Sequence, residues 1–288
     1  METSLHRQLK NLYAPEAERQ ECFLDGYRID AVDEGELIEI QQGSLGAIRP
    51  KVKRLLERHR VRVVKPLAAR TLLIRRDRRK GTEISRRWSP RHDSFATLFL
   101  DLVHFVDVFP HPRLTLEVLL VEQEEDRVPV RRRWFRAKDY RTTDRRLIAI
   151  EDRRVLRTAG DLLGLVKCDW GRVGVCDRSA PHPQPLSPKG GEGSRHAAPS
   201  PPTPLPRRGE GRTRTAPSHA PLVAPALVAG RRENAFTTED IATACGIPRW
   251  LAQKLAYCLR KTGVFVPVGK RRHSWLYRIE FEDGRAAA

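Results

Sequence analysis

The chain has 288 residues, enough for one large domain or two small ones, and a formal net charge of +18, with 54 lysines and arginines against 36 acidic residues. This charge makes a polyanion, above all nucleic acid, the first partner to consider, although a GC-rich genome that encodes arginine freely would give the same composition. Five cysteines without a CxxC pair argue against a disulfide framework and against a structural zinc site, which indicates a reducing cytoplasm.

Neither the start of the chain nor its most apolar segment predicts a place in a membrane. The stretch METSLHRQLKNLYA lacks the apolar run of a signal peptide. The segment FATLFLDLVHFVDVF, residues 95–109, is too short to span a bilayer and is interrupted by Asp101, His104 and Asp107. We therefore expect a soluble cytoplasmic protein.

The first part of the chain predicts the element order helix, three strands, helix, strand. Ser4 can cap the first helix. The pair Asp25-Gly26 and a loop that contains Gly35 are strong hairpin signals, and the β-branched run RVRVVKPL is typical of a buried strand. The expected elements are a helix at 5–13, strands at 21–24, 28–32 and 37–41, a helix at 45–59 and a strand at 60–67.

Further elements extend this region without a chemical signal of their own. We expect a hairpin around Lys80-Gly81, an amphipathic helix at 95–109, a strand at 114–122 and a short helix at 159–166. Together these elements predict an α/β domain over residues 1–170.

Two carboxylates lie inside strands that otherwise look buried. Asp30 follows Ile29, and Glu39 lies between Ile38 and Ile40. Burying such charges costs free energy unless a metal ion, a hydrogen-bond network or a counter-ion compensates. Oxygen ligands at the ends of adjacent strands suit Mg²⁺ or Mn²⁺, which would lower the pKa of a bound water and offset charge on a phosphate. Strand alternation also allows both acids to face solvent from a two-sided hairpin.

The order Asp30, eight intervening residues and the tripeptide Glu39-Ile40-Gln41 resembles the PD-(D/E)XK nuclease superfamily, whose restriction-endonuclease-like fold has an αβββαβ core. The resemblance covers about residues 1–68. It implies a metal ion held by Asp30, Glu39 and the Ile40 carbonyl, and hydrolysis of phosphodiester bonds. The superfamily often adds an acid from the first helix, for which Glu2 is the candidate and Glu18 or Glu21 the alternatives.

Gln41 departs from the family pattern, because lysine is expected there. Glutamine can hydrogen-bond a water but carries no charge and cannot act as a base. Some members tolerate glutamine, and others move the cation to the following helix, where Arg49 and Lys53 lie beside the apolar stripe and would point back towards the carboxylates. The resemblance thus implies a catalytic set of Asp30, Glu39, Gln41, Arg49 and Lys53, although Arg49 and Lys53 equally suit a solvated face that attracts phosphate.

Residues 179–232 are rich in proline, glycine, serine and arginine and cannot form a packed core, so we expect a disordered linker. It contains a near-repeat, PQPLSPKGGEGSR from Pro183 and PTPLPRRGEGRTR from Pro202, which resembles the translated dispersed palindromic repeats of some bacterial reading frames. A passive insertion is the main interpretation, and a proline-rich docking ligand is the alternative.

The last part of the chain, residues 233–282, predicts a helix, a turn, a second helix and a basic hairpin. Thr237 or Thr238 caps the first helix, Gly246 ends it, and the second helix spans about 248–262. Two strands then flank the segment GKRRHS. This order resembles a winged helix-turn-helix domain, which implies nucleic-acid binding.

The predicted nucleic-acid contacts lie on the second helix, opposite its apolar arc, and on the hairpin tip. These residues are Arg249, Trp250, Gln253, Lys254, Tyr257, Lys261, Lys270, Arg271 and Arg272. The alternative is a winged helix used for protein contact, with Trp250 and Tyr257 buried against the first domain.

The sequence therefore predicts a nuclease-like α/β domain at 1–170, a linker at 179–232 and a winged helix at 233–282. The leading function is Mg²⁺- or Mn²⁺-dependent hydrolysis of DNA in processing, repair or defence. The alternative is a catalytically degenerate DNA-binding or regulatory protein that uses both domains only for binding. A third interpretation is a structural adaptor whose arginines reflect genome composition alone.

Overall fold

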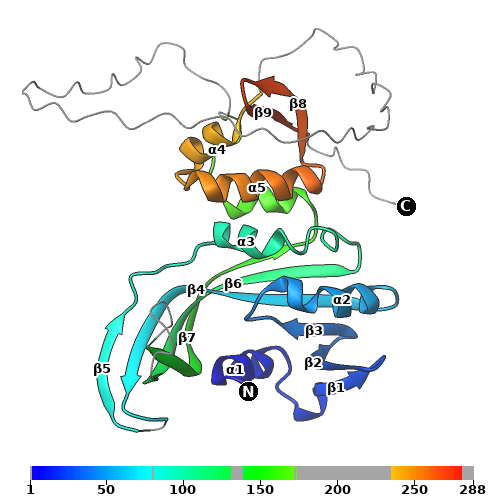
Figure 1. Cartoon of the computed structure of the whole chain (residues 1–288). Coiled ribbons are helices and arrows are strands. Elements are labelled where there is room, and N and C mark those ends of the chain that lie inside the picture. Colours follow the sequence, from blue (N-terminus) through cyan, green and yellow to red (C-terminus); the bar gives the residue numbers. More distant parts are fainter. Residues whose placement is uncertain (1, 80, 131–138, 172, 174–234, 281–288) are drawn as a thin grey trace, which may run out of the picture. The chain divides into compact units, whose positions relative to one another are not determined.

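The structure, a computed structural model, describes residues 2–79, 81–130, 139–171, 173 and 235–280, and the predicted linker at 179–232 lies outside them. Within these ranges the chain is a mixed α/β protein built on one large mixed sheet (Figure 1). The α/β class predicted from the sequence is confirmed at this level. No helix in the described ranges is long and apolar enough to cross a membrane.

The predicted order helix, three strands, helix, strand is present in the structure. Its elements are α1 (Ser4–Tyr13), β1 (Gln20–Leu24), β2 (Tyr27–Asp33), β3 (Glu36–Ile40), α2 (Leu45–Leu56) and β4 (Arg60–Arg76). The first three strands form an antiparallel meander, and α2 carries the chain over to β4, which pairs parallel with β3. Asp25, Gly26, Glu34 and Gly35 all adopt positive φ, as two-residue hairpin turns of type I′ require.

The sheet continues beyond β4 in three further strands. They are β5 (Glu83–Trp88), β6 (Leu114–Pro129) and β7 (Tyr140–Leu156). The strand order is β1-β2-β3-β4-β6-β7, with β6 parallel to β4, β7 antiparallel to β6, and β5 paired to the outer half of β4. The sequence predicted the strands of β4 and β6 as much shorter segments, and it predicted no strand at the position of β7.

Charge pairs explain why these strands lack the usual apolar alternation. Arg76 on β4 and Arg146 on β7 both bind Asp126 on β6, at 3.0 and 3.2 Å. Arg145 on β7 binds Glu125 on β6 at 3.0 Å. Pairs of opposite charge across neighbouring strands stabilise a sheet as apolar pairs do, so a charged segment can extend it.

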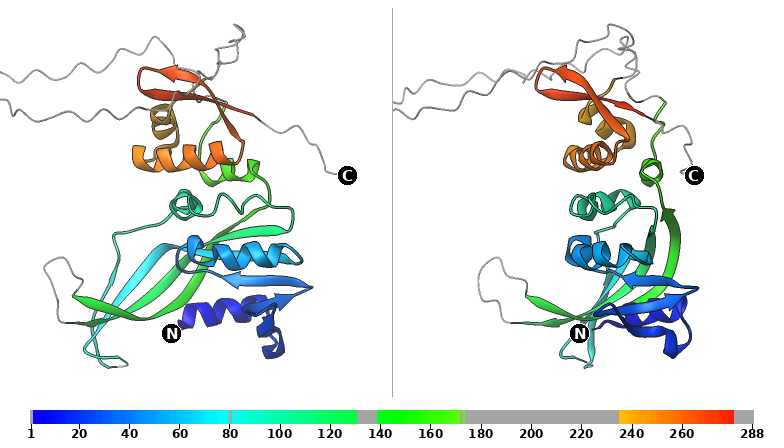
Figure 2. Two further views of the ribbon diagram at one scale, coloured as in Figure 1. Left: turned by 45° about the vertical axis from the view of Figure 1, so that its right-hand side comes forward. Right: turned by 90° about the vertical axis from the view of Figure 1, so that its right-hand side faces the viewer.

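Helices cover both faces of the sheet (Figure 2). On one face Leu5 and Leu9 of α1 pack against Ile38 of β3. On the other face Val52 and Leu55 of α2 belong to the main hydrophobic core. The side chain that caps α1 is Thr3, which accepts the N–H of His6, rather than the predicted Ser4. The Ser4 hydroxyl instead donates to Asp144 at 2.6 Å and so fastens α1 to β7.

The helix predicted at 95–109 is much shorter in the structure. A 3₁₀ turn, η2 (Phe95–Thr97), leads into α3 (Leu98–Leu102), and turns follow up to residue 108. Bonds to the third residue back, such as Val108 N–H to Phe105 O, replace the α-helical pattern there. The predicted short helix at 159–166 is also a 3₁₀ segment, η3 (Gly160–Leu165).

Two helices and a hairpin follow at the C-terminal side: α4 (Thr238–Cys245), α5 (Arg249–Lys261), β8 (Phe265–Arg271) and β9 (Ser274–Ile279). Thr237 caps α4 together with Asp240, and Gly246 ends it in the left-handed conformation, at φ 61°. The predicted helices and hairpin are therefore present, with strands that extend further into the basic tip than expected.

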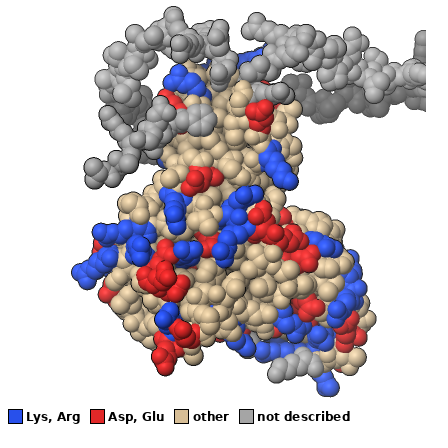
Figure 3. Space-filling view, turned by 180° about the vertical axis from the view of Figure 1, so that it is seen from behind, with Lys and Arg blue, Asp and Glu red and all other residues tan. Residues whose placement is uncertain are grey.

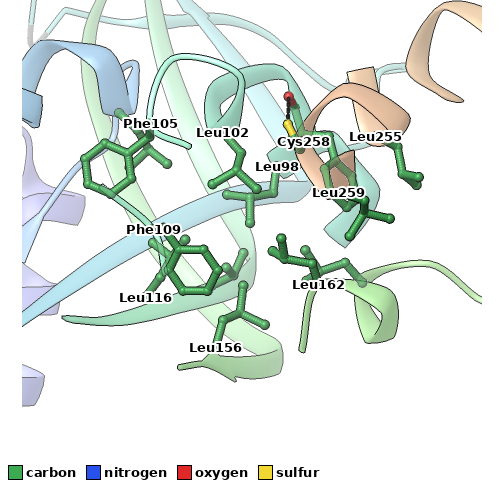
Figure 4. Close-up of a cluster of buried hydrophobic side chains, with 14 of the residues drawn as sticks. Leu98, Leu102, Phe105, Phe109, Leu116, Leu156, Leu162, Leu255, Cys258 and Leu259 are labelled. Atoms are coloured by element: carbon green, nitrogen blue, oxygen red, sulfur yellow. Dashed lines mark hydrogen bonds between the residues drawn. The ribbon is translucent and has the colours of Figure 1, made fainter. Parts of the chain in front are cut away.

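The apolar arc of α5 packs against α3 (Figure 4). Cys258 Sγ lies 3.9 Å from the carbonyl oxygen of Phe99. Trp170 meets Phe265 edge to face, with ring centroids 5.9 Å apart. The described residues up to 173 and from 235 to 280 accordingly form one compact unit, and one hydrophobic core extends across the boundary predicted between the first domain and the C-terminal domain.

Candidate active site

The two predicted carboxylates lie on adjacent strands, and Asp30 is held by two donors. Its Oδ2 accepts the backbone N–H of Ile40 at 2.8 Å, and its Oδ1 lies 3.2 Å from His6 Nε2 on α1. Burial acts to raise the pKa of Asp30, but the hydrogen bonds from His6 and from Ile40 outweigh it, so the pKa lies below its ordinary value. Asp30 is therefore ionised at neutral pH.

Glu39 is the more deeply buried acid, with 5% of its surface exposed. Lys51 Nζ forms an ion pair with Glu39 Oε1, and no other described side chain donates to that oxygen. Burial is the main cause that raises the pKa of Glu39 to about 7; the charge of Asp30 adds to it, while Lys51 and the backbone N–H of Asp30 oppose it. The acidic site thus holds one fixed anion and one carboxyl group that titrates near neutrality.

The cation beside the carboxylates is Lys51, which the sequence analysis did not select. Lys51 Nζ also donates to the carbonyl of Arg28 on β2. Lys51 on α2 therefore links β2 and β3, the two strands that carry the acids. The predicted Arg49 and Lys53 point elsewhere, since both pair with Asp107, at 3.7 and 3.0 Å. On this point the prediction was wrong: Lys51 flanks the buried stripe of α2 on the edge opposite to Arg49 and Lys53, and a helical wheel alone does not show which edge faces β3.

Gln41 turns away from the two acids. Its side-chain N–H donates to the carbonyl of Ser44 at 2.7 Å, and its backbone N–H donates to Val64 at 2.9 Å. Gln41 therefore shapes the loop that leads into α2. Ile40 enters the site through its N–H, and the role predicted for its carbonyl stays a prediction.

The acids proposed for the first helix are engaged with other groups or lie outside it. Glu2 pairs with Lys10 at 2.6 Å, and Glu21 pairs with Lys10 as well. Glu18 lies in the 3₁₀ turn η1 (Ala17–Arg19). The side chain that α1 contributes to the acidic site is His6, in the first turn of the helix. Nothing in the sequence around His6 marked it as a site residue.

Asp30 and Glu39 have the donor chemistry of a magnesium site. Among the described residues no three His, Cys, Asp or Glu side chains are grouped so that they alone would hold a metal ion. Mg²⁺ commonly binds through one or two carboxylates, with waters and a substrate phosphate completing its shell. Burial is the main cause that raises the pKa of Glu39 and the charge of Asp30 adds to it, so a cation bound near the pair would favour the ionised form of Glu39. A hard divalent cation therefore fits the two carboxylates.

All the predicted nucleic-acid contacts of the C-terminal region are exposed. They are Arg249, Trp250, Gln253, Lys254, Tyr257, Lys261, Lys270, Arg271 and Arg272. Trp250 is 55% exposed and Tyr257 37%, so neither is buried against the first region. Lys270 Nζ lies 4.6 Å from the ring centre of Trp275, which places a cation and an aromatic face together on the hairpin.

The positive charge is not concentrated on every face of the molecule. On the face seen in Figure 3, basic and acidic side chains alternate over the sheet region. The uninterrupted set of exposed basic and aromatic side chains on α5 and the β8–β9 hairpin is therefore the more distinctive surface for a polyanion.

A family model described as a domain of unknown function (DUF8091) matches residues 3–157. An uncharacterized protein of Treponema pallidum (strain Nichols) is 33% identical over 177 residues, which is 61% of this chain and 70% of that relative. No solved structure matches the chain significantly. The residues matched by the family model run from α1 to the end of β7 and include the acidic site, whereas α4 and α5 lie outside them.

Proposed function

The chain belongs to the DUF8091 family, and from the acidic site of that domain we propose a metal-dependent, nuclease-like protein that binds DNA and hydrolyses phosphodiester bonds. The observation that carries this proposal is the convergence of Asp30, Glu39 and Lys51 from β2, β3 and α2. Two acids and a lysine are the residue types of the PD-(D/E)XK signature, with the lysine supplied by the helix instead of position 41.

The order of the elements supports the same proposal. The meander β1-β2-β3, the crossover through α2 and the parallel strand β4 resemble the αβββαβ core of these nucleases. The two acids lie on its second and third strands, as the family pattern requires. Fold likeness alone would not indicate an activity, so the acidic site remains the main argument.

Each side chain has a distinct chemical part in the proposed site. Asp30, fixed by Ile40 N–H and His6, supplies a permanent negative charge for a divalent cation. Glu39, on the neighbouring strand β3, would supply the second carboxylate to the same cation. Lys51 can orient an attacking water and offset charge on the phosphate. A bound Mg²⁺ would polarise the scissile phosphate.

The C-terminal region would hold the nucleic acid. A winged helix-turn-helix presents its second helix to the major groove, with base-edge contacts from polar side chains and phosphate contacts from basic ones. On α5 the side chains of Arg249, Gln253, Lys254 and Tyr257 are exposed on one arc, while the opposite arc is buried against α3. The exposed arc suits this use.

A second function is favoured by a specific observation. Each carboxylate already has a side-chain partner in the protein, with His6 Nε2 at 3.2 Å from Asp30 and the Lys51 ammonium on Glu39. Such pairing permits a stable site without metal, which is what a catalytically degenerate DNA-binding protein would have. The two functions differ in whether the wild-type protein cleaves DNA at all.

The test is cleavage of supercoiled plasmid and of duplex oligonucleotides with Mg²⁺ or Mn²⁺. We expect the wild type to nick DNA and expect Asp30→Asn, Glu39→Gln and Lys51→Met each to lower the rate about 100-fold or more, with DNA affinity retained. Lys53→Met is the matched control, because Lys53 lies on the same helix but pairs with Asp107. Salt-dependent DNA binding without cleavage by the wild type would support the second function instead.

A further inference from the structure

A cleft lies at the end of the sheet opposite to the acidic site. It has a volume of about 790 Å³ and opens where β4 and β6 begin, between Arg60 and Leu114, and beside the start of β3 at Glu36. Asp30 and Ile40 meet at the other end of β3. Five arginines line the cleft: Arg60, Arg62, Arg113, Arg153 and Arg157.

A fully buried carboxylate fixes the wall of this cleft. Glu117 on β6 has none of its surface exposed and accepts three hydrogen bonds or ion pairs from three other elements. Tyr13 Oη on α1 donates at 2.6 Å, Arg62 on β4 lies at 2.9 Å, and Arg153 on β7 binds through Nε at 2.8 Å. Glu117 thereby holds two guanidinium groups at the cleft before any ligand arrives.

The arginines retain donor capacity that the protein does not use. Arg153 binds Glu117 through Nε, so the two terminal nitrogens of its guanidinium group can still donate to a ligand. Arg60 has a backbone carbonyl, that of Glu34, as its acceptor at 3.4 Å. The backbone N–H of Arg157 donates to Asp161 at 2.7 Å, while its guanidinium has no ion-pair or hydrogen-bond partner among the described residues.

The acidic residues around the cleft do not balance these cations. Asp33, Glu34 and Glu36 line it and the buried Glu117 lies in its wall, so four carboxylates stand against five arginines. Glu36 is already bound by Arg62 at 2.7 Å, and Asp33 faces Arg19 at 3.5 Å. The cleft therefore keeps a small excess of positive charge.

We propose that this cleft binds the phosphate of a nucleotide. A guanidinium group can donate two parallel N–H hydrogen bonds to two oxygens of one phosphate. Several arginines held around one cleft therefore favour an anion with more than one negative charge. The volume is in the range of small-molecule sites, and the exposed Leu12 and Pro112 at its rim offer apolar surface to a base. The nucleotide is either free or the phosphorylated end of a nucleic-acid strand. The site stands independently of the acidic site, since it shares no residue with it.

The experiment measures binding of the full chain to pyrophosphate, ADP and a short oligonucleotide with either a 5′-phosphate or a 5′-hydroxyl, by calorimetry and fluorescence anisotropy. We expect Arg157→Gln to weaken binding about tenfold, because it removes a charged donor that has no partner in the described part of the chain. Arg154→Gln is the matched control: Arg154 lies on β7, pairs with Asp152 at 3.3 Å and does not line the cleft. We expect that variant to bind as the wild type does.

The probes also separate the two sources of the phosphate. Preference for ADP supports a free nucleotide, and preference for the 5′-phosphate over the 5′-hydroxyl supports a strand end. The proposal is overturned if no phosphate probe binds at about 1 mM, or if Arg154→Gln weakens binding as much as Arg157→Gln does. Thermal unfolding of both variants checks that each is folded. Failure here leaves the cleavage test of the acidic site unaffected.

Discussion

Lys51 Nζ on α2 and Glu39 Oε1 on β3 form an ion pair between the helix and the sheet, with 19% and 6% of the two side chains exposed. The pair supplies the site with the lysine that is missing at position 41. It also makes the conformation of α2 and the charge of the acidic site depend on each other, because among the described residues neither group has another partner of opposite charge as close.

Replacing Lys51 separates its structural role from that of the neighbouring basic residues. Lys51→Met leaves a buried carboxylate without its cation, so we expect a loss of about 2 kcal/mol in the free energy of unfolding at pH 8. Lys53→Met, at a side chain that is 55% exposed, should cost less than about 0.5 kcal/mol. Urea unfolding of both variants decides the matter, and equal losses would contradict the assignment of Lys51 as the partner of Glu39.

The raised pKa of Glu39 predicts a pH dependence with a definite sign. Because the folded pKa is about 7 and the ordinary value is 4.5, the folded state holds this proton more tightly than the unfolded state does. This contribution to stability is complete below about pH 4.5 and is lost as pH rises through 7. We expect it to amount to roughly 1 to 3 kcal/mol.

The Glu39→Gln variant tests whether stability falls as pH rises through 7. Other groups titrate in the same range, so the contribution of Glu39 is the difference in the free energy of unfolding between the wild type and this variant. The free energy of unfolding of the wild type should fall between pH 5 and 7 relative to that of the variant, as measured by urea titration at each pH. A difference that stays constant with pH would show that Glu39 ionises with an ordinary pKa.

Glu117 should be among the most sensitive positions in the sheet. Glu117→Gln removes the charge that Arg62 and Arg153 share, and leaves both near a buried neutral group, so we expect a loss of about 3 kcal/mol. Glu57→Gln is the control, because Glu57 is 54% exposed and pairs with Arg54 on the surface. Chemical denaturation that gave equal losses for both would mean that the buried network does not stabilise the sheet.

The exposed arc of α5 predicts a loss of DNA affinity without a loss of stability. Trp250→Ala should lower the melting temperature little and weaken duplex binding about tenfold, since stacking and wedge contacts of aromatic residues contribute 1 to 3 kcal/mol or so. Trp88→Ala is the matched control, because Trp88 is also exposed, at 42%, but lies on β5. Anisotropy titrations with labelled duplex at two salt concentrations give the comparison, and equal effects of the two variants would argue against α5 as the contact surface.

Local signals predicted the N-terminal elements well. The αβββαβ order followed from turn chemistry at Asp25-Gly26 and Gly35 and from the aliphatic run before Leu67, all of which act over a few residues. The strand β7 escaped prediction because its stabilisation depends on partners far along the chain, such as Asp126 for Arg146. Sequence periodicity does not report pairs of that kind.

The acidic site could be predicted only in part for a similar reason. Asp30 and Glu39 stood out as charges inside apolar strands, whereas His6 and Lys51 look like ordinary polar residues of amphipathic helices. Their role depends on how α1 and α2 rotate about their axes once docked on the sheet. Helical periodicity places a residue beside a stripe, and tertiary packing chooses the side.

The hydrophobic core that the first and C-terminal regions share affects how well the protein tolerates residues inserted between these two regions. Trp170 and Phe236 both pack against Phe265, with ring centroids 5.9 and 5.1 Å apart, so the described chain reaches the same part of the core before and after residues 174–234. The entropic cost of joining two fixed points by a flexible chain grows only with the logarithm of its length, about 0.6 kcal/mol for each doubling. Genetic material gained or lost between these two anchor points would change the length of the protein while leaving its folding equilibrium almost untouched.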